Sequence, residues 1–531
     1  MSEQLSWRTM PQPIPDEEIT QTYQCDVLVV GAAHSGTMVM EAAVDGGASV
    51  IALEKKTREK FHVNGAEVGH INSEYLRKRG VPEVDPIDLF NEWLRRAGNR
   101  ANQSLVMKFC QNCGEAFDEY ISVFSDLEME EVRVKYWPEP KHFERSLNGY
   151  KTWPGTALFP GIFIKGSTTL TECIKRHHAR AAKKGAVIHY GTEALYPILE
   201  NGRVAGIVAK CMDGSYARYM AQKGVVLAAG DFGGNQEMSQ ELLVDVVDLM
   251  DEEDKFFSLG MGDGRGIQMG VWAGGCMESR PVASMGGNSL YATAMMEGFG
   301  CLWLNENGKR YCNEMFSGDS VVAGLACNQE KHGPFYSLFD SSVAEHLQYG
   351  PPCHASFDTS DPASFSQLEE KMQKALAAGA EGCPGLGGIR GSMAYGAETW
   401  EELAEYLGFS GMRKETFLKS VARYNQLCEN KRDEDFGKDP SLMIPLNKPP
   451  FYGVMIPRTA PGGSLCTVGG LVTDENQQVL NKRKDPIPGL YATGNCCGRR
   501  FGAQYATPIA GVSISMALTL GRELGKFLAE L

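Results

Sequence analysis

The segment from Cys25 to Lys56, CDVLVVGAAHSGTMVMEAAVDGGASVIALEKK, constrains the fold more than any other part of this chain. An apolar run over residues 26–30 ends at Gly31, small and apolar residues then recur at helical spacing, and a second apolar run covers residues 49–55. This order predicts a β-turn-α-β unit. The turn nearly matches the dinucleotide fingerprint G-x-G-x-x-G, with Gly31 and Gly36 in the outer positions and Ala33 in the middle one.

The alanine weakens this fingerprint without excluding a nucleotide. The middle glycine normally lets the backbone approach the pyrophosphate at the helix N-terminus. One methyl group at Ala33 is accommodated where the pyrophosphate stands slightly farther off. Glu54 ends the second predicted strand, where an acidic residue receives a ribose hydroxyl. The alternative is a plain packing turn followed by a surface glutamate.

Bulk properties narrow the class of protein. A chain of 531 residues has room for two or three domains, and a net charge of −14 argues against nucleic acid or an acidic membrane as a partner. We see neither a secretory signal nor an apolar run long enough for a membrane span. Fifteen cysteines in such a chain indicate reduced thiols and predict a cytoplasmic location.

Five later segments carry a family resemblance. They are KGVVLAAGDFGGNQEM (223–238), GMGDGRGIQMGVWAGG (260–275), CLWLNENGKRYCNE (301–314), RYNQLCENKRDEDFGKDP (423–440) and PIPGLYATGNCCG (486–498). In this order they resemble motifs of the FAD-dependent fumarate reductase / 3-ketosteroid dehydrogenase superfamily, from about residue 24 to the end of the chain. The resemblance implies an α/β fold: a Rossmann-like FAD-binding domain built from both chain ends, with an inserted α+β capping domain and the active site where cap and flavin meet.

The expected boundaries follow from this organisation. Residues 1–24 form a Pro-rich, acidic lead-in, residues 25–285 and 451–531 form the FAD-binding domain, and residues 286–450 form the cap. The resemblance implies that Glu54 holds the adenosine ribose, and that the last helix offers N–H groups and its positive end to flavin O2. The expected contacts of a non-covalent FAD are Gly31, Ala33, Ser35, Gly36, Glu54, Lys55, Ala229, Gly230, Asn495, Gly511, Ser513 and Ile514.

The dicarboxylate branch of the superfamily fits poorly. Its members use arginine and histidine to clamp carboxylates, because the guanidinium fork matches a carboxylate bidentately. By motif alignment, this chain has Gly318 in place of the proton-delivering arginine, Ala294 for the acid of the proton relay, Cys466 for the histidine and, at about Pro508, no clamp arginine. Fumarate reduction is therefore disfavoured.

The ketosteroid branch fits better at Tyr505, which lies ten residues after Asn495. In that branch a tyrosine hydroxyl and a backbone N–H hold the substrate carbonyl, as an oxyanion hole does. The branch's glycine-rich turn is replaced here by YATPIAGVS, so the sequence does not identify the residue whose N–H would assist Tyr505. The alternative for Tyr505 is a wall residue whose hydroxyl binds backbone or water.

Other candidates keep two interpretations each. His70 either protonates substrate or only holds its loop. Arg500, like Arg499, either contacts substrate or phosphate or lies on a solvated face. His62 lies near where some relatives attach FAD covalently, but its flanking residues do not match.

Further groups are less informative. Three cap tyrosines are unranked as proton donors: Tyr291, Tyr311 and Tyr336. Cys110 and Cys113 form a C-x-x-C pair that is better explained as two half-buried helix thiols than as a redox pair. We expect no metal site, because no haem-attachment motif or four-cysteine cluster is present.

These observations predict an FAD-dependent ene-reductase. It is expected to reduce a C=C bond beside a carbonyl in an apolar enone, such as a 3-oxo-Δ4 or Δ1 steroid or a bile-acid derivative, with NAD(P)H or a redox carrier as the electron donor. One alternative is a reductase of an unsaturated monocarboxylate, cinnamate- or urocanate-like, gripped by Arg499 or Arg500. Another is a flavin electron-transfer or binding subunit without a small-molecule substrate.

Overall fold

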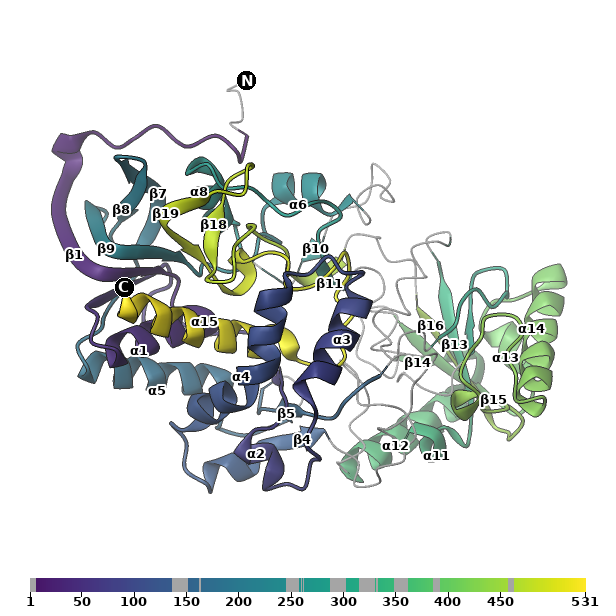
Figure 1. Cartoon of the computed structure of the whole chain (residues 1–531). Helices are drawn as coiled ribbons and strands as arrows, with labels where there is room; N and C mark the ends of the chain where they lie inside the picture. The colour runs from purple at the N-terminus through teal and green to yellow at the C-terminus, as the bar shows by residue number, and fades with distance from the viewer. Residues whose placement is uncertain are drawn as a thin grey trace.

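The computed structural model describes residues 6–135, 151–161, 164–244, 257–258, 260, 262–286, 302–314, 330, 333–347, 362–384, 392–456 and 463–531. Figure 1 shows a larger lobe, which carries both chain ends, and a smaller lobe formed around β13 to β16. Three of the positions considered above, Tyr291, Ala294 and Gly318, lie outside the described residues. Among the residues described, no helix is both long and apolar enough to cross a membrane.

An eight-stranded sheet forms the centre of the larger lobe and takes strands from both ends of the chain. The main order is β18-β19-β9-β1-β2-β6, in which β1 pairs in parallel with β2 and β9, and β19 pairs in parallel with β9. This arrangement confirms the predicted α/β fold. The strands are β1 (Ile19–Val30), β2 (Val50–Glu54), β6 (Val187–Tyr190), β7 (Glu193–Glu200), β8 (Arg203–Lys210), β9 (Tyr216–Leu227), β18 (Gln478–Leu480) and β19 (Pro486–Ala492).

Helices cover this sheet, and the last one packs against the first. A side chain at Gly521 of α15 would meet Ser35 O at 2.5 Å, and one at Gly525 would meet Val39 O at 2.5 Å, so only glycine permits this backbone approach. The helices are α1 (His34–Asp45), α2 (Glu74–Arg77), α3 (Pro86–Arg96), α4 (Gln103–Ile121), α5 (Leu170–Lys183), α6 (Gln236–Leu242), α8 (Arg265–Trp272) and α15 (Val512–Glu530).

Two three-stranded sheets and several 3-10 turns complete the larger lobe. One sheet has the order β3-β5-β4 and the other the order β10-β17-β11. Their bounds are β3 (Glu67–Gly69), β4 (Arg133–Lys135), β5 (Thr156–Leu158), β10 (Phe257–Ser258), β11 (Ser284–Gly286) and β17 (Gly463–Thr467), and the 3-10 turns here are η1 (Asp16–Glu18), η2 (Glu128–Glu131) and η8 (Gly494–Cys496).

The smaller lobe is built on a five-stranded antiparallel sheet of order β12-β13-β16-β15-β14. Strand β16 pairs in this sheet, which therefore extends beyond the expected cap boundary at residue 450. The elements are β12 (Leu302–Leu304), β13 (Phe335–Asp340), α11 (Val343–Leu347), α12 (Pro362–Ala378), η6 (Gly379–Glu381), β14 (Cys383–Pro384), β15 (Met393–Ala397), α13 (Trp400–Tyr406), α14 (Gly411–Glu429), η7 (Pro440–Leu442) and β16 (Phe451–Ile456).

The N-terminal lead-in packs on the larger lobe. Trp7 is buried, and its indole N–H donates to Glu241 Oε2 at 2.7 Å. The indole N–H of Trp272 in α8 donates back to the carbonyl of Trp7 at 3.0 Å. Because β1 already begins at Ile19, the last part of the predicted lead-in is a strand of the sheet.

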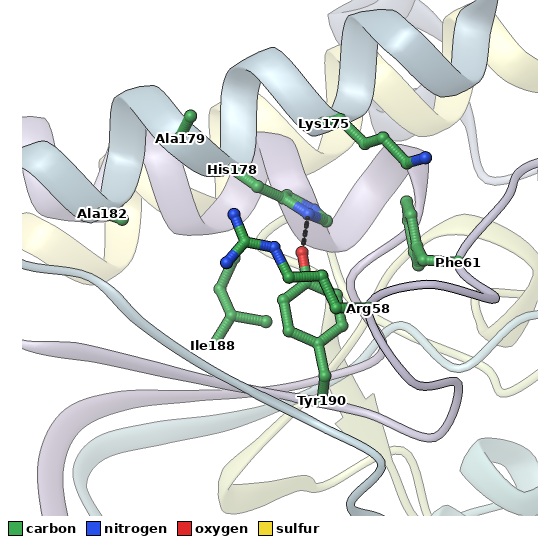
Figure 2. A pocket seen from close by; sticks show the side chains of 8 residues that line it. All are labelled: Arg58, Phe61, Lys175, His178, Ala179, Ala182, Ile188 and Tyr190. Carbon is green, nitrogen blue, oxygen red and sulfur yellow. Dashed lines mark hydrogen bonds between the residues drawn. The ribbon is translucent and has the colours of Figure 1, made fainter.

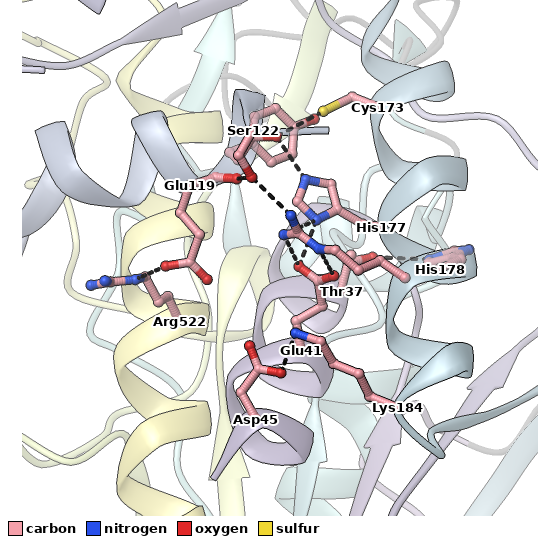
Figure 3. Close-up of polar contacts among 12 residues, drawn as sticks. Thr37, Glu41, Asp45, Glu119, Ser122, Cys173, His177, His178, Lys184 and Arg522 are labelled. Atoms are coloured by element: carbon pink, nitrogen blue, oxygen red, sulfur yellow. Dashed lines mark hydrogen bonds and ion pairs between the residues drawn. The ribbon is translucent and has the colours of Figure 1, made fainter. Parts of the chain in front are cut away.

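A buried polar network joins α1 to α5 and α4 (Figure 3). Glu41 in α1 accepts two hydrogen bonds from Arg180 of α5, both at 2.8 Å, and lies 2.5 Å from Nδ1 of His177. Nε2 of His177 lies 2.7 Å from the carbonyl of Tyr120 in α4. Burial raises the pKa of Glu41, but the hydrogen bonds from Arg180 and His177 outweigh it and hold this pKa at about 2. The network thus joins three helices through one carboxylate.

We expect Glu41→Gln to lower the free energy of unfolding by about 3 kcal/mol at pH 7, because it leaves the half-buried Arg180 guanidinium without its charged partner. Since the folded-state pKa of Glu41 is depressed, the stabilisation is complete above about pH 4.5 and is lost as pH falls towards 2. Urea unfolding at several pH values measures both effects. Glu200→Gln, at an exposed strand end, is the control. Equal unfolding free energies for wild type and Glu41→Gln would contradict this account.

Candidate functional site

The turn between β1 and α1 is shaped by glycine. Gly31 has φ +100°, and a side chain there would meet Ala228 O at 2.4 Å. A side chain at Gly36 would meet Gly31 O at 1.9 Å. Ala33 is the N-cap of α1, and its methyl side chain cannot cap this helix end. The first N–H groups of α1 therefore remain available to an anion, as in dinucleotide sites.

Glu54 lies beside this turn, at the end of β2. Its carboxylate accepts the N–H of Ala32 at 3.2 Å and that of Lys56 at 2.9 Å. Lys55 instead extends to Asp263 at 3.0 Å and Glu193 at 2.9 Å. Asp263 was not singled out from the sequence, although the GDG at the start of α8 marks it as a helix-start carboxylate.

The C-terminal segments meet the same turn. A side chain at Gly494 would lie 2.4 Å from the hydroxyl of Ser35, and the thiol of Cys496 lies 3.3 Å from the carbonyl of Gly230. Gly230 has φ +90° and no atom within 4 Å of the position its side chain would take. The structure thus brings residues 31–36, 229–230 and 494–496 together from three distant parts of the chain.

The start of α15 adjoins these segments through residues 65–69. Its N-cap is Gly511, with φ +82°, where a side chain would meet the backbone of Glu67 at 2.7 Å. Ile514 contacts Gly65, and the N-cap glycine has no side chain with which to cap this helix. Two helix starts whose N-cap residues offer no capping side chain, a glycine turn and the Glu54 carboxylate match the donor and acceptor set that the phosphates and ribose of FAD require.

Residues 26–514 match the family model described as FAD binding domain. The chain belongs to this family. Vinyl phenol reductase from Lactiplantibacillus plantarum is 25% identical over 521 residues, covering 95% of this chain and 96% of the relative. Fumarate reductase (cytochrome) from Shewanella frigidimarina is 24% identical over 517 residues, covering 95% and 77%.

A solved structure supports the fold. The 3-ketosteroid-Δ4-(5α)-dehydrogenase from Rhodococcus jostii RHA1 superimposes with a TM-score of 0.68 and 20% identity, covering 98% of this chain and 100% of that one. The superfamily resemblance is therefore confirmed, and the protein is an FAD-dependent oxidoreductase that acts on C=C bonds. The names of these relatives differ in substrate, so they do not determine the substrate of this chain.

Tyr505 and Arg500, both candidates for catalysis, are buried close to the start of α15. The hydroxyl of Tyr505 accepts the N–H of Ser513 at 3.1 Å, and its ring meets Phe501 edge-on at 4.9 Å. Arg500 donates to the carbonyls of Cys497 at 2.8 Å and Val468 at 3.0 Å.

Arg500 also orients a predicted FAD contact. Its Nη2 donates to Asn495 Oδ1 at 2.7 Å, while its Nη1 has no hydrogen-bond partner in the described part of the chain. Burial lowers the pKa of this guanidinium. Arg500 is 1% exposed, so the interpretation of a solvated face does not hold for it.

The contacts of His70 favour the interpretation in which it holds its loop. Its ring nitrogens lie 3.1 Å from Val68 O and 2.8 Å from the hydroxyl of Ser73, and the ring stacks on Phe117 at 3.7 Å. Burial lowers the pKa of His70 to about 3. A neutral imidazole with both nitrogens engaged has no proton to offer at neutral pH.

Glu278 is a buried carboxylate that sequence reasoning missed. It accepts the N–H of Gly470 at 2.8 Å and that of Arg499 at 3.0 Å, so it joins two loops on either side of Arg500. Burial raises the pKa of Glu278 to about 7. No local pattern marks it, because both partners lie about 200 residues away in the sequence.

Cys110, Cys113 and Cys466 are poor nucleophiles. Cys110 and Cys113 are fully buried rather than half-buried as expected, and burial raises the pKa of Cys113 to about 12. Desolvation also raises the pKa of Cys466, in the position of the expected histidine, to about 12. These thiols stay protonated at neutral pH, so none of the three is activated as a thiolate.

Two of the remaining candidates lie in the smaller lobe. Tyr336 packs on Phe409 at 4.6 Å, and Tyr311 lies 5.7 Å from Phe335. On the exposed loop after β2, Nδ1 of His62 lies 3.0 Å from the carbonyl of Lys60. Among the described residues, no group of three or more His, Cys, Asp or Glu side chains is placed to hold a metal.

We expect Glu54→Ala to weaken FAD binding about 10- to 100-fold, the cost of one charge-assisted hydrogen bond. Glu54→Gln keeps a hydrogen-bond acceptor and is expected to lose less affinity for FAD than Glu54→Ala. Flavin absorbance after dialysis against graded FAD measures the affinity, and Glu200→Ala is the control. Unchanged affinity in Glu54→Ala would exclude Glu54 as a contact of FAD.

Proposed function

We propose that the protein reduces a C=C bond conjugated to a carbonyl in a largely apolar, uncharged substrate, such as a 3-oxo-Δ4 or Δ1 steroid or a bile-acid-like enone. The observation that carries this proposal is the pairing of the Tyr505 hydroxyl with the Ser513 N–H, beside the aromatic ring of Phe501. A hydroxyl held at a helix start, next to an apolar wall, suits a neutral carbonyl.

FAD, when bound, would supply hydride to the β-carbon of the double bond. The Tyr505 hydroxyl would donate a hydrogen bond to the carbonyl oxygen, where negative charge develops, and an unassigned acid would protonate the α-carbon to complete the reduction. The Ser513 N–H polarises this hydroxyl by donating to its oxygen, which strengthens its O–H as a donor. Arg500, fixed by three acceptors, adds positive potential next to Tyr505.

The positions of the carboxylate clamp support an uncharged substrate. Cys466 carries a protonated thiol, and Pro508 has no side-chain donor while its carbonyl accepts the N–H of Trp153. Gly318 and Ala294 have no charged side chain that could replace the residues expected there. A dicarboxylate would thus lack the clamp residues at Cys466 and Pro508 and the proton relay at Gly318 and Ala294.

A second candidate is a reductase of an unsaturated monocarboxylate. The unpartnered Nη1 of the buried Arg500 favours it, because a buried guanidinium donor without a partner is costly and a carboxylate would satisfy it. The vinyl phenol reductase relative is compatible with either candidate, since a phenol oxygen also takes up charge from a conjugated double bond.

The electron donor and the mode of FAD attachment belong to the same proposal. We infer a non-covalent FAD, because His62 lies on an exposed loop with its Nδ1 near a backbone carbonyl. Heat denaturation should then release all flavin into the supernatant. NAD(P)H or a redox carrier supplies the electrons.

Tyr505→Phe should slow the reoxidation of pre-reduced flavin by a 3-oxo-Δ4-steroid about 100-fold while FAD content stays intact, because one oxyanion donor is lost. Anaerobic stopped-flow absorbance measures this step. Tyr406→Phe, whose hydroxyl binds Glu402 on the surface of α13, is the control. If only acrylates reoxidise the flavin, the substrate is an unsaturated monocarboxylate and not an enone. Reoxidation by a protein partner alone would exclude both substrates.

A further inference from the structure

A surface cavity of about 350 Å³ lies between α5 and the loop that follows β2 (Figure 2). None of the residues expected to contact FAD lines it. The lining residues are Arg58, Phe61, Lys175, His178, Ala179, Ala182, Ile188 and Tyr190. The size suits one nucleoside monophosphate, since small-ligand pockets begin at about 300 Å³.

The floor of this cavity is aromatic and uncharged. The ring of Phe61 lies 5.1 Å from that of His178 and 6.1 Å from that of Tyr190. Nε2 of His178 lies 2.9 Å from the carbonyl of Ala32, which only accepts, so Nε2 carries the proton. Nδ1 then accepts from the hydroxyl of Tyr190 at 2.6 Å. Burial lowers the pKa of His178 to about 4, so the ring is neutral. Phe61 and His178 are 3% and 4% exposed, and the rings are tilted against one another, so the half-buried Tyr190 is the ring that a planar base would contact.

The rim carries two cations. Lys175 extends from α5, and Arg58 reaches over the cavity from the loop, as Figure 2 shows. Both are exposed, and neither forms an ion pair with a carboxylate of the described residues. The nearby Glu172 is instead bound by Arg176 at 2.9 Å. Two cations over an aromatic floor, on a chain of net charge −14, indicate an anionic aromatic ligand.

We propose that this cavity binds an adenine nucleotide, with the base beside Tyr190 and a phosphate at the cationic rim that carries Arg58 and Lys175. Two sources share this chemistry: a free mononucleotide and the adenylate half of NAD(P)H. The floor touches the FAD turn through the bond from His178 to Ala32, so the ligand would lie directly behind that turn.

Calorimetric titration of the FAD-loaded protein tests this site, because bound FAD blocks its own adenosine site. AMP should bind saturably with a Kd below about 1 mM, and Arg58→Ala/Lys175→Ala should weaken it at least about 10-fold. Lys60→Ala/Lys183→Ala removes equal charge from the same loop and helix outside the cavity and should bind as wild type. Flavin content of each variant reports folding.

The titrants distinguish the sources. Binding of NADPH in competition with AMP would support the site and assign it to the dinucleotide, whereas AMP binding without NADPH binding would assign it to a mononucleotide. The absence of saturable AMP binding, equal affinity in the Arg58/Lys175 variant, or inorganic phosphate binding as tightly as AMP would overturn the proposal.

Discussion

The close packing of α15 against α1 is the contact on which the rest of the structure depends. Gly521 and Gly525 let the two backbones approach until side chains at these positions would overlap carbonyl oxygens of α1. This packing places the last helix beside a turn formed almost 500 residues earlier in the chain. The start of α15, and with it the Ser513 N–H that binds Tyr505, takes its position from this packing.

Features that depend on a short stretch of sequence were predicted correctly. The β-turn-α-β unit and the place of Glu54 at the end of β2 follow from short-range periodicity, and the structure has both. Lys55 was expected to contact FAD, but its ammonium is bound by Glu193 and Asp263, more than 130 residues away. No local pattern encodes such a pair.

The burial of polar groups was equally beyond local reasoning. Next to Arg499 in the sequence, Arg500 resembles a solvent-exposed arginine. In the fold it is buried and donates to two carbonyls that only the folded chain brings together. His70 resembles a titrating group in sequence, while its actual partners make it a neutral loop support. In both cases solvation, rather than residue type, decides the chemistry.

Hydrogen exchange of the backbone amides, compared with and without FAD, tests most directly that both chain ends form one cofactor site. FAD should slow exchange at residues 33–36 and at residues 512 and 514 together, because both helix starts offer N–H groups to the cofactor. Protection confined to residues 33–36, with no change at the start of α15, would contradict this account.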